Sequence, residues 1–280
     1  MRIGAHIRTG RGLAEAVAYA ASVGCETMQV FSKSPLQWRS PKHDEGEVGS
    51  FRYALARHDL ALAATHAAYL INVASKDDAL WERSIAALAD EILRAQALGA
   101  PAVVTHLGSS PDARPHACAR AAEALARALA QTEGCAAGVY LENSAGSGST
   151  LGATAEEILA VLFAIPTEHR SRAAICIDTC HAHVAGYDLS TEAGWKRLLD
   201  PIEREGARVA LVHANDATYA CGSRRDRHAW IGEGTIGQRG FALMFEQDVV
   251  RAADVVTEMP GETPSKDVIN VARLKELRDR

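Results

Sequence analysis

Short apolar runs alternate along this chain with longer segments whose apolar residues recur every three or four positions. A short run rich in β-branched residues is typical of a buried strand, whereas the wider spacing predicts an amphipathic helix. The predicted strands cover residues 3–6, 27–31, 60–65, 102–105, 138–141, 173–177, 209–212 and 254–257. The predicted helices cover about 13–23, 48–58, 77–98, 117–129, 195–203, 241–245 and 266–277. A capping box of Thr154 and Glu157 opens another helix.

The order of these elements predicts a single α/β domain that spans residues 1–280. Eight strand–helix repeats in roughly this length are typical of a (β/α)8 TIM barrel, and no low-complexity linker divides the chain. An open, doubly wound sheet has the same alternation of elements. In that fold, however, ligand-binding residues should cluster near one switch point of the sheet and should not recur on most strands.

Most of the predicted strands end on a side chain that can bind a metal ion. These strand-end residues are His66, His106, Glu142, Asp178, His213 and Glu258. One such residue alone is commonly only a polar group at a turn. Six in register after apolar runs favour a shared metal site at the C-terminal ends of the barrel strands. Oxygen and nitrogen donors of this kind suit zinc, manganese or iron.

Three further candidate ligands follow on predicted loops. His181 comes three residues after Asp178, and Asp226 and His228 are alternate residues of an extended loop, so their side chains should point the same way. The nine candidates exceed the three or four protein ligands of one catalytic ion and predict two or three ions. Cys176 and Cys180 flank Asp178, and we interpret both as small buried residues.

Composition and charge narrow the choice of partner and compartment. The net charge of −5, from 30 basic and 35 acidic residues, argues against a strongly basic nucleic-acid coat but allows a local basic groove around metal ions. No apolar run approaches the ~18 residues that span a bilayer, and no signal-peptide pattern precedes the first strand. We therefore expect a cytoplasmic protein with no membrane contact. Its six cysteines have no metal-binding spacing and should be reduced thiols.

Two glycine-rich stretches and one histidine carry weaker signals. Residues 232–237 match the letters of the dinucleotide fingerprint but do not follow a convincing strand, so we predict no nucleotide site there. Residues 146–150 lack the lysine of a phosphate-binding loop, and we interpret them as a flexible loop at the barrel mouth. His6 ends the first strand, where it is either a hydrogen-bond partner of a metal ligand or a plain polar residue.

A series of motifs, in order along nearly the whole chain, resembles the endonuclease IV family of metal-dependent apurinic/apyrimidinic endonucleases. The motifs are Gly4-Ala5-His6, Ser32-Lys33-Ser34, Gln37-Trp38-Arg39, residues 69–72, residues 141–146, residues 176–181, residues 213–216, residues 222–228 and residues 232–234. The resemblance implies a TIM barrel with a three-zinc site. This agrees with the fold and the ligand set that the strand pattern predicts.

The resemblance also assigns the candidate ligands to individual ions. The first zinc would be held by His66, His106 and the bridging Glu142, the second by Glu142, Asp178, His213 and Glu258, and the third by His181, Asp226 and His228. Manganese or iron would suit some of these positions. Glu142 and Glu258 would be the catalytic carboxylates. The implied reaction is attack of a metal-bound hydroxide on the phosphate 5′ to an abasic sugar, which leaves a 3′-hydroxyl.

The implied partner is duplex DNA that contains abasic sites or blocked 3′ ends, bound by a monomer. The DNA contacts that the resemblance implies are Lys33, Leu36, Gln37, Arg39, Tyr69, Leu70, Arg224, Arg225 and Arg227. The chain departs from the family pattern at Leu36, where an arginine is common, at Ala67, where an aspartate is common, and at Leu107, where proline is usual. An apolar Leu36 can still wedge between bases, but the loss of a cation should weaken attraction to DNA.

Two other functions stay open at the level of sequence. A xylose-isomerase-like sugar isomerase or epimerase has the same barrel with one divalent metal, but it would not need His181, Asp226 and His228. A non-catalytic DNA- or partner-binding relative would keep the barrel without the reaction. The complete set of candidate ligands argues against this third function.

Overall fold

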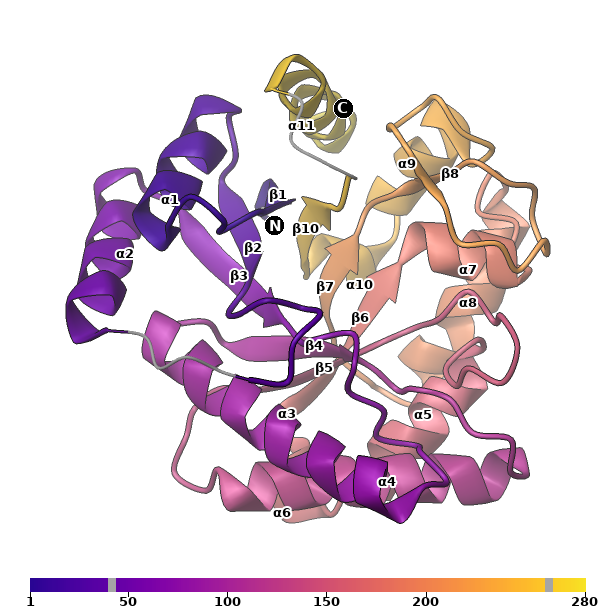
Figure 1. Cartoon of the computed structure of the whole chain (residues 1–280). Helices are drawn as coiled ribbons and strands as arrows, with labels where there is room; N and C mark the ends of the chain where they lie inside the picture. Colours follow the sequence, from indigo (N-terminus) through magenta and orange to yellow (C-terminus); the bar gives the residue numbers. More distant parts are fainter. Residues whose placement is uncertain (40–43, 260–263) are drawn as a thin grey trace.

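The computed structural model describes residues 1–39, 44–259 and 264–280, and within them eight parallel strands close into a barrel (Figure 1). The barrel strands are β1 (Ile3–Ile7), β2 (Thr27–Phe31), β3 (Ala61–His66), β4 (Ala102–His106), β5 (Gly138–Glu142), β6 (Ala173–Asp178), β7 (Val209–His213) and β10 (Asp254–Thr257). Each strand pairs in parallel with its neighbour in the closed order β1-β10-β7-β6-β5-β4-β3-β2. The predicted TIM barrel is confirmed, and the open sheet is wrong.

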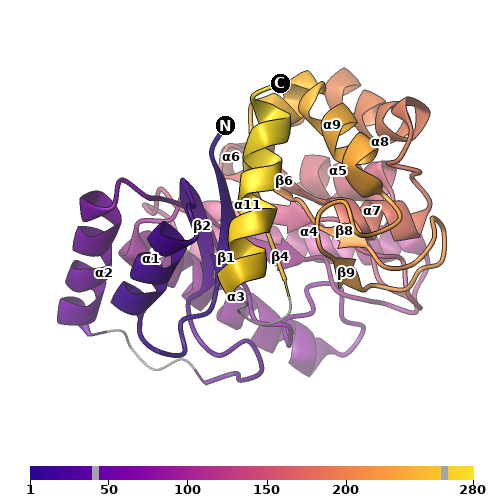
Figure 2. The same ribbon diagram turned by 90° about the horizontal axis from the view of Figure 1, so that it is seen from above.

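Helices form a layer around the outside of the barrel, and Figure 2 shows the last of them, α11, beside β1. The longer helices are α1 (Leu13–Ser22), α2 (Glu45–Arg57), α3 (Asp78–Leu98), α4 (Arg114–Gln131), α5 (Ala155–Ala164), α8 (Glu192–Arg204), α9 (Gly237–Phe245) and α11 (Pro264–Arg278). Three of them, α2, α4 and α8, begin three residues before the predicted start, because a polar first turn carries no hydrophobic periodicity. Among the described helices, none is both long and apolar enough to cross a membrane.

Several short elements were not predicted. They are α6 (Thr167–Arg170), α7 (Thr179–Ala185), α10 (Asp248–Arg251), and an antiparallel pair outside the barrel, β8 (Asp216–Ala217) and β9 (His228–Ala229). The prediction that His181 lies on a loop is wrong, because His181 is part of α7. This helix is too short to show a periodic pattern. Asp178, the last residue of β6, begins it by accepting the backbone N–H of His181 at 2.7 Å.

Alternate residues of each barrel strand face the barrel axis. The inward side chains form a cluster of mostly small, apolar residues, namely Ala63, Ala64, Ala102, Val104, Tyr140, Ala174, Cys176, Leu211 and Val256. Because side chains alternate with a period of two, the next inward positions on β4, β5 and β6 are His106, Glu142 and Asp178. The alternation that fills the barrel therefore delivers the polar strand ends to its mouth. Cys176 and Cys180 are fully buried, as interpreted from the sequence.

The start of α5 fixes the loop that follows β5. The hydroxyl of Thr154 accepts the N–H of Glu157 at 3.2 Å, as the predicted capping box requires. The Glu157 carboxylate, however, accepts the N–H groups of Gly152 and Ala153, at 2.8 and 3.1 Å, and so bonds the preceding loop. The helix start is thus tied to the segment that leads away from Glu142.

Replacing Thr154 with alanine should lower the free energy of unfolding by about 1 kcal/mol, because the N–H of Glu157 loses its partner. Urea denaturation followed by circular dichroism measures this change. Thr154→Ser keeps the hydroxyl and is the matched control. An alanine variant as stable as the wild type would show that this cap contributes nothing.

Candidate metal centre

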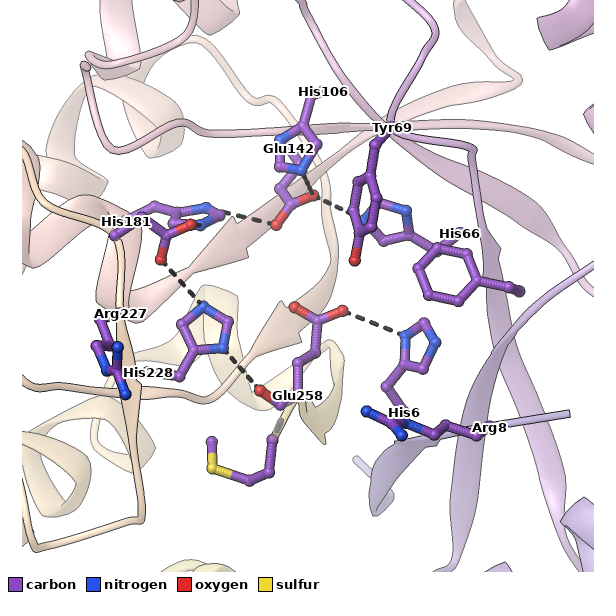
Figure 3. Close-up of a pocket in the computed structure, with 13 residues that line it drawn as sticks. His6, Arg8, His66, Tyr69, His106, Glu142, His181, Arg227, His228 and Glu258 are labelled. Atoms are coloured by element: carbon purple, nitrogen blue, oxygen red, sulfur yellow. Dashed lines mark hydrogen bonds and ion pairs between the residues drawn. The ribbon is translucent and has the colours of Figure 1, made fainter. Parts of the chain in front are cut away.

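The ligands predicted from the sequence converge at the mouth of the barrel in adjoining groups. Figure 3 shows those that line the cavity, among them His66, His106, Glu142, His181, His228 and Glu258. Within each group the ligand atoms lie within 4.8 Å of one another. The groups are His66, His106 and Glu142; Glu142, Asp178, His213 and Glu258; Asp178, His181 and His228; and Cys180, Asp226 and His228. Glu142 belongs to two groups and Asp178 to two. Shared carboxylates of this kind are what neighbouring cations require.

Glu142 lies at the centre of the cluster. Its Oε2 is 3.2 Å from His66 Nε2 and 3.4 Å from His106 Nε2, and its Oε1 is 3.0 Å from His213 Nδ1. Burial favours the neutral form of this carboxyl, but the surrounding imidazoles outweigh burial and hold the pKa of Glu142 well below its usual value. The carboxylate is therefore ionised at neutral pH and can act as a ligand.

Four of the imidazoles have one ring nitrogen tied to an oxygen away from the cluster centre. The pairs are His66 Nδ1 with the Ala67 carbonyl at 2.9 Å, His181 Nδ1 with the Asn143 carbonyl at 3.0 Å, His228 Nδ1 with the Glu258 carbonyl at 2.7 Å, and His213 Nε2 with Gln29 Oε1 at 3.0 Å. These oxygens only accept, so each of these nitrogens carries the proton. The other nitrogen faces carboxylates. Histidines that bind metals are held in this way.

Two further observations fit a divalent cation at this place. The Nε2 atom of His228 is buried without a hydrogen bond in the described parts of the chain, and it faces Asp226 Oδ1 at 3.4 Å and Asp178 Oδ2 at 3.6 Å. Burial alone would lower the pKa of His181, but Asp178, Asp226 and Glu142 raise it to about 10. These carboxylates therefore stabilise a positive charge that lies between them. The set of oxygen and imidazole donors suits zinc, manganese or iron.

Cys180 is a poorer ligand than its place in one group suggests. Its Sγ is 3.9 Å from Asp226 Oδ1, and burial raises the pKa of the thiol. Because the thiolate is the form that binds metals, a protonated Cys180 leaves the imidazole and carboxylate donors as the better set.

Two asparagines hold Asp178 in place. The side chain of Asn143 accepts the N–H of Asp178 at 2.6 Å and donates to its carbonyl at 3.0 Å. The amide nitrogen of Asn215 donates to Asp178 Oδ2 at 2.6 Å, while its oxygen accepts the N–H of Glu258 at 2.7 Å. Asn143 and Asn215 thus join the ends of β5, β6, β7 and β10. Both residues belong to motifs seen in the sequence, but no role was predicted for them.

The glycine-rich residues 232–237 form an internal anion site. The carboxylate of Asp216 accepts backbone N–H groups from Gly232, Gly234 and Ile236 at 2.9–3.0 Å. A Cβ atom on Gly234 would lie 2.4 Å from Asp216 Oδ1, so this position needs glycine. The glycines whose spacing matches the dinucleotide fingerprint therefore surround a carboxylate of the protein itself. They fix the segment next to the β8–β9 pair, which carries His228.

A cavity of about 520 Å³ opens onto the cluster. Figure 3 shows Arg8 beside His6 on one side of Glu258 and Arg227 beyond His228 on the other, with Tyr69 near His66. The sequence prediction missed Arg8, which follows the first strand and carries no motif. The alternatives for His6 are now resolved, since its Nδ1 lies 3.3 Å from Glu258 Oε1. His6 contacts a candidate metal ligand.

The predicted DNA contacts occupy different environments. Leu36 is 72% exposed and Tyr69 59% exposed, and the N–H of Tyr69 bonds the carbonyl of Pro35, so the two loops are adjacent. Gln37, Arg39, Arg224 and Arg227 are exposed, and Leu70 is half-buried. The guanidinium of Arg225 lies 3.8 Å over the ring of Tyr219.

Lys33 differs from the other predicted DNA contacts because it is buried. Its ammonium lies 3.4 Å from Glu91 Oε1, and Glu91 itself is fully buried on α3. The same carboxylate accepts the hydroxyl of Ser32 at 2.5 Å and the N–H of Ala68 at 3.3 Å. Glu91 thereby joins the loop after β2 to the loop after β3. A buried, paired Lys33 has an internal role in addition to the phosphate contact predicted for it.

Comparison with known proteins decides the family. Residues 17–277 match the family model described as xylose isomerase-like TIM barrel. The chain is 36% identical over 278 residues to a probable endonuclease 4 of Methanoculleus marisnigri, and the alignment covers 98% of each protein. The chain belongs to the endonuclease IV family. The resemblance of the sequence motifs is confirmed, and as a member of this family the chain is a nuclease and therefore a hydrolase.

Solved structures agree with this assignment. The crystal structure of endonuclease IV from Thermus thermophilus matches with a TM-score of 0.85 and 31% identity, over 100% of this chain and 99% of that one. A D-tagatose 3-epimerase-like protein also matches, with a TM-score of 0.73 and 19% identity, over 100% of this chain and 97% of that one. The second likeness shows the shared barrel alone. The endonuclease IV family is therefore favoured over the sugar isomerases and epimerases.

Proposed function

We propose that this member of the endonuclease IV family cleaves duplex DNA at the phosphodiester 5′ to an abasic site and leaves a 3′-hydroxyl. The observation that carries the proposal is the set of adjoining ligand groups that share Glu142 and Asp178 in one open cavity. Neighbouring cations a few ångströms apart suit a phosphodiester, whose attacking and leaving oxygens both need stabilisation. A sugar isomerase that uses one metal ion needs no second or third group of ligands.

The residues divide among three zinc ions as follows. The first would be held by His66, His106 and Glu142, the second by Glu142, Asp178, His213 and Glu258, and the third by His181, Asp226 and His228. When bound, zinc ions lower the pKa of water to about 7 and offset the charge that develops on the phosphate. Manganese or iron could replace zinc at some positions, because the donors are the same.

The protein's own groups orient the substrate and the ligands. Glu142 and Glu258 are the catalytic carboxylates, and Glu258 Oε1 accepts the side-chain amide of Gln29 at 2.9 Å and lies 3.3 Å from His6 Nδ1. Leu36 and Tyr69 would enter the duplex beside the lesion, and their exposure supports this role. Turning a nucleotide out of the duplex costs a few kcal/mol, least where the base is already missing, so this arrangement favours damaged DNA.

Positive charge on the cavity rim complements a DNA backbone. Arg8 and Arg227 line the cavity, and within the described ranges neither guanidinium has a hydrogen-bond or ion-pair partner. Arg39 and Arg224 are exposed as well, on a chain whose net charge is −5. We propose duplex DNA with abasic sites or blocked 3′ ends as the substrate, and a monomeric, cytoplasmic enzyme.

Glu142→Gln should reduce incision by more than about 100-fold. Residues that only support a metal ligand typically change metal affinity or activity by about 10–100-fold, and the loss of a ligand shared by two ions should have a larger effect. Binding of the lesion should be largely kept. A fluorescent duplex with one abasic analogue, incubated with metal-loaded protein, reports both incision and binding. Prolonged chelation of the wild type should also abolish incision.

Glu203→Gln is the matched control for this assay, because Glu203 is an exposed carboxylate on the outer helix α8. Near-normal turnover by Glu142→Gln would refute the assigned mechanism. Binding of the duplex by metal-loaded wild type without incision would identify a non-catalytic relative. Sugar turnover with an intact duplex would identify an isomerase.

Leu36→Arg should tighten binding to the abasic duplex and steepen its salt dependence by about 0.9 in the slope of log K against log salt, because one phosphate contact is added. Leu93→Arg adds the same charge at a 50% exposed position on α3 and serves as the control. Fluorescence anisotropy at several salt concentrations measures both variants. Equal slopes for Leu36→Arg and the wild type would show that this loop does not face the DNA.

Arg8→Gln should weaken binding and reduce the same salt slope by about 0.9, because the cavity rim loses one phosphate contact. Arg11→Gln removes an exposed charge three residues further along the chain, outside the cavity lining, and should have a smaller effect. The same anisotropy titration compares them. Identical losses in the two variants would indicate a general effect of net charge and no contact made by Arg8.

A further inference from the structure

Gln29 contacts the metal centre although it lies inside a strand and is no part of the predicted ligand set. It is the third residue of β2, is fully buried, and pairs in the barrel register with His6 on β1. Both ends of its amide bond residues of the site. Its Oε1 lies 3.0 Å from His213 Nε2, and its Nε2 donates to Glu258 Oε1 at 2.9 Å and lies 2.8 Å from His6 Nδ1.

The orientation of this amide follows from its neighbours. The ionised carboxylate of Glu258 only accepts, so the amide nitrogen must face Glu258. The oxygen of Gln29 then faces His213 and can only accept, so the proton of this imidazole resides on Nε2. The reversed amide would set two oxygens against each other. Gln29 therefore keeps the proton of His213 on Nε2, the ring nitrogen that points away from the cluster.

This orientation determines the role of the other nitrogen of the His213 ring. His213 Nδ1 lies 3.0 Å from Glu142 Oε1 and 3.0 Å from Glu258 Oε2. With one proton fixed at Nε2, Nδ1 is the ring nitrogen that faces these two carboxylates and would coordinate a cation bound between them. One amide thus sets the coordinating atom of His213 and the position of Glu258, two ligands assigned to the same ion.

We infer that Gln29 is a positioning residue of the metal centre, which selects Nδ1 of His213 as the coordinating atom and holds Glu258 beside it. The inference rests on the metal centre of the proposed function and is independent of the DNA substrate. A buried amide with a purely structural role would bond backbone groups of the barrel, whereas the contacts of Gln29 are with side chains of the site. Supporting residues of this type commonly change metal affinity by about 10–100-fold.

The test compares Gln29→Met with the wild type. Methionine keeps the length and approximate volume of the side chain but removes its polar contacts with His213, Glu258 and His6. Thr27→Val is the matched control, because Thr27 is a buried polar residue on the same strand whose hydroxyl bonds the carbonyl of Ala61, away from the site. Each protein is first freed of metal with a chelator and is then titrated with zinc in competition with a chromophoric chelator. This titration gives the number of zinc ions bound and their affinity. Thermal unfolding of the metal-free proteins shows whether each variant folds without metal.

Gln29→Met should bind its weakest zinc ion about 10–100-fold less tightly than the wild type, while Thr27→Val should match the wild type. Long-range ¹H–¹⁵N spectra of the zinc-loaded wild type should show the proton of His213 on Nε2. If Gln29→Met does not fold, Gln29→Asn serves instead, because its shorter amide cannot reach both His213 and Glu258, and it should show a smaller loss.

Wild-type zinc affinity in Gln29→Met or in the folded Gln29→Asn would overturn the inference, as would a proton on Nδ1 of His213 in the zinc-loaded wild type. A wild type that binds no zinc would overturn it as well. A wild type that binds zinc but leaves the abasic duplex intact would refute the proposed reaction, while weaker zinc binding by Gln29→Met would still support this inference.

Discussion

Burying several carboxylates in one small volume is the constraint on which the rest of this structure depends. Glu142 and Asp178 have almost no exposed surface, and Glu258 lies against both His6 and His213. Unpaired charges at such depth would cost several kcal/mol each. The imidazoles and the amides of Asn143 and Asn215 offset this cost, and the cations of the proposed site would offset it further.

The strand pattern was enough to predict the barrel and the strand-end ligands, because both depend on the same two-residue alternation. His106 and Glu142 could be found since each ends an apolar run. Gln29 could not, because a glutamine in the middle of a strand has no distinctive spacing. Helix α7 was missed because its seven residues are fixed by the Asp178 cap and by tertiary contacts. The burial of Lys33 depends on Glu91, a residue from a distant helix, which no local pattern shows.

The same barrel occurs in enzymes with different chemistry, so the candidate ligands outside the strands bear most on the function proposed for this chain. The match to a D-tagatose 3-epimerase-like protein extends over the whole chain, so the architecture alone does not decide the reaction. In this chain His181 lies on α7, and Asp226 and His228 lie on the segment that Asp216 and the glycine-rich residues 232–237 hold in place. In the proposed function, this additional layer would enlarge a strand-end site to one that binds several ions.

The buried carboxylate of Glu91 links the loops that carry Leu36 and Tyr69, and this link bears on the cost of recognising DNA. Each flexible side chain that becomes ordered in a complex loses entropy worth about 0.5–1.5 kcal/mol, and ordering of a loop adds to this cost. Ser32 and Ala68 are bonded to one carboxylate in the protein without DNA, so the two loops behave as one preordered wedge. Much of this entropy is lost when the chain folds, and more of the contact energy would then be available for the proposed opening of the duplex.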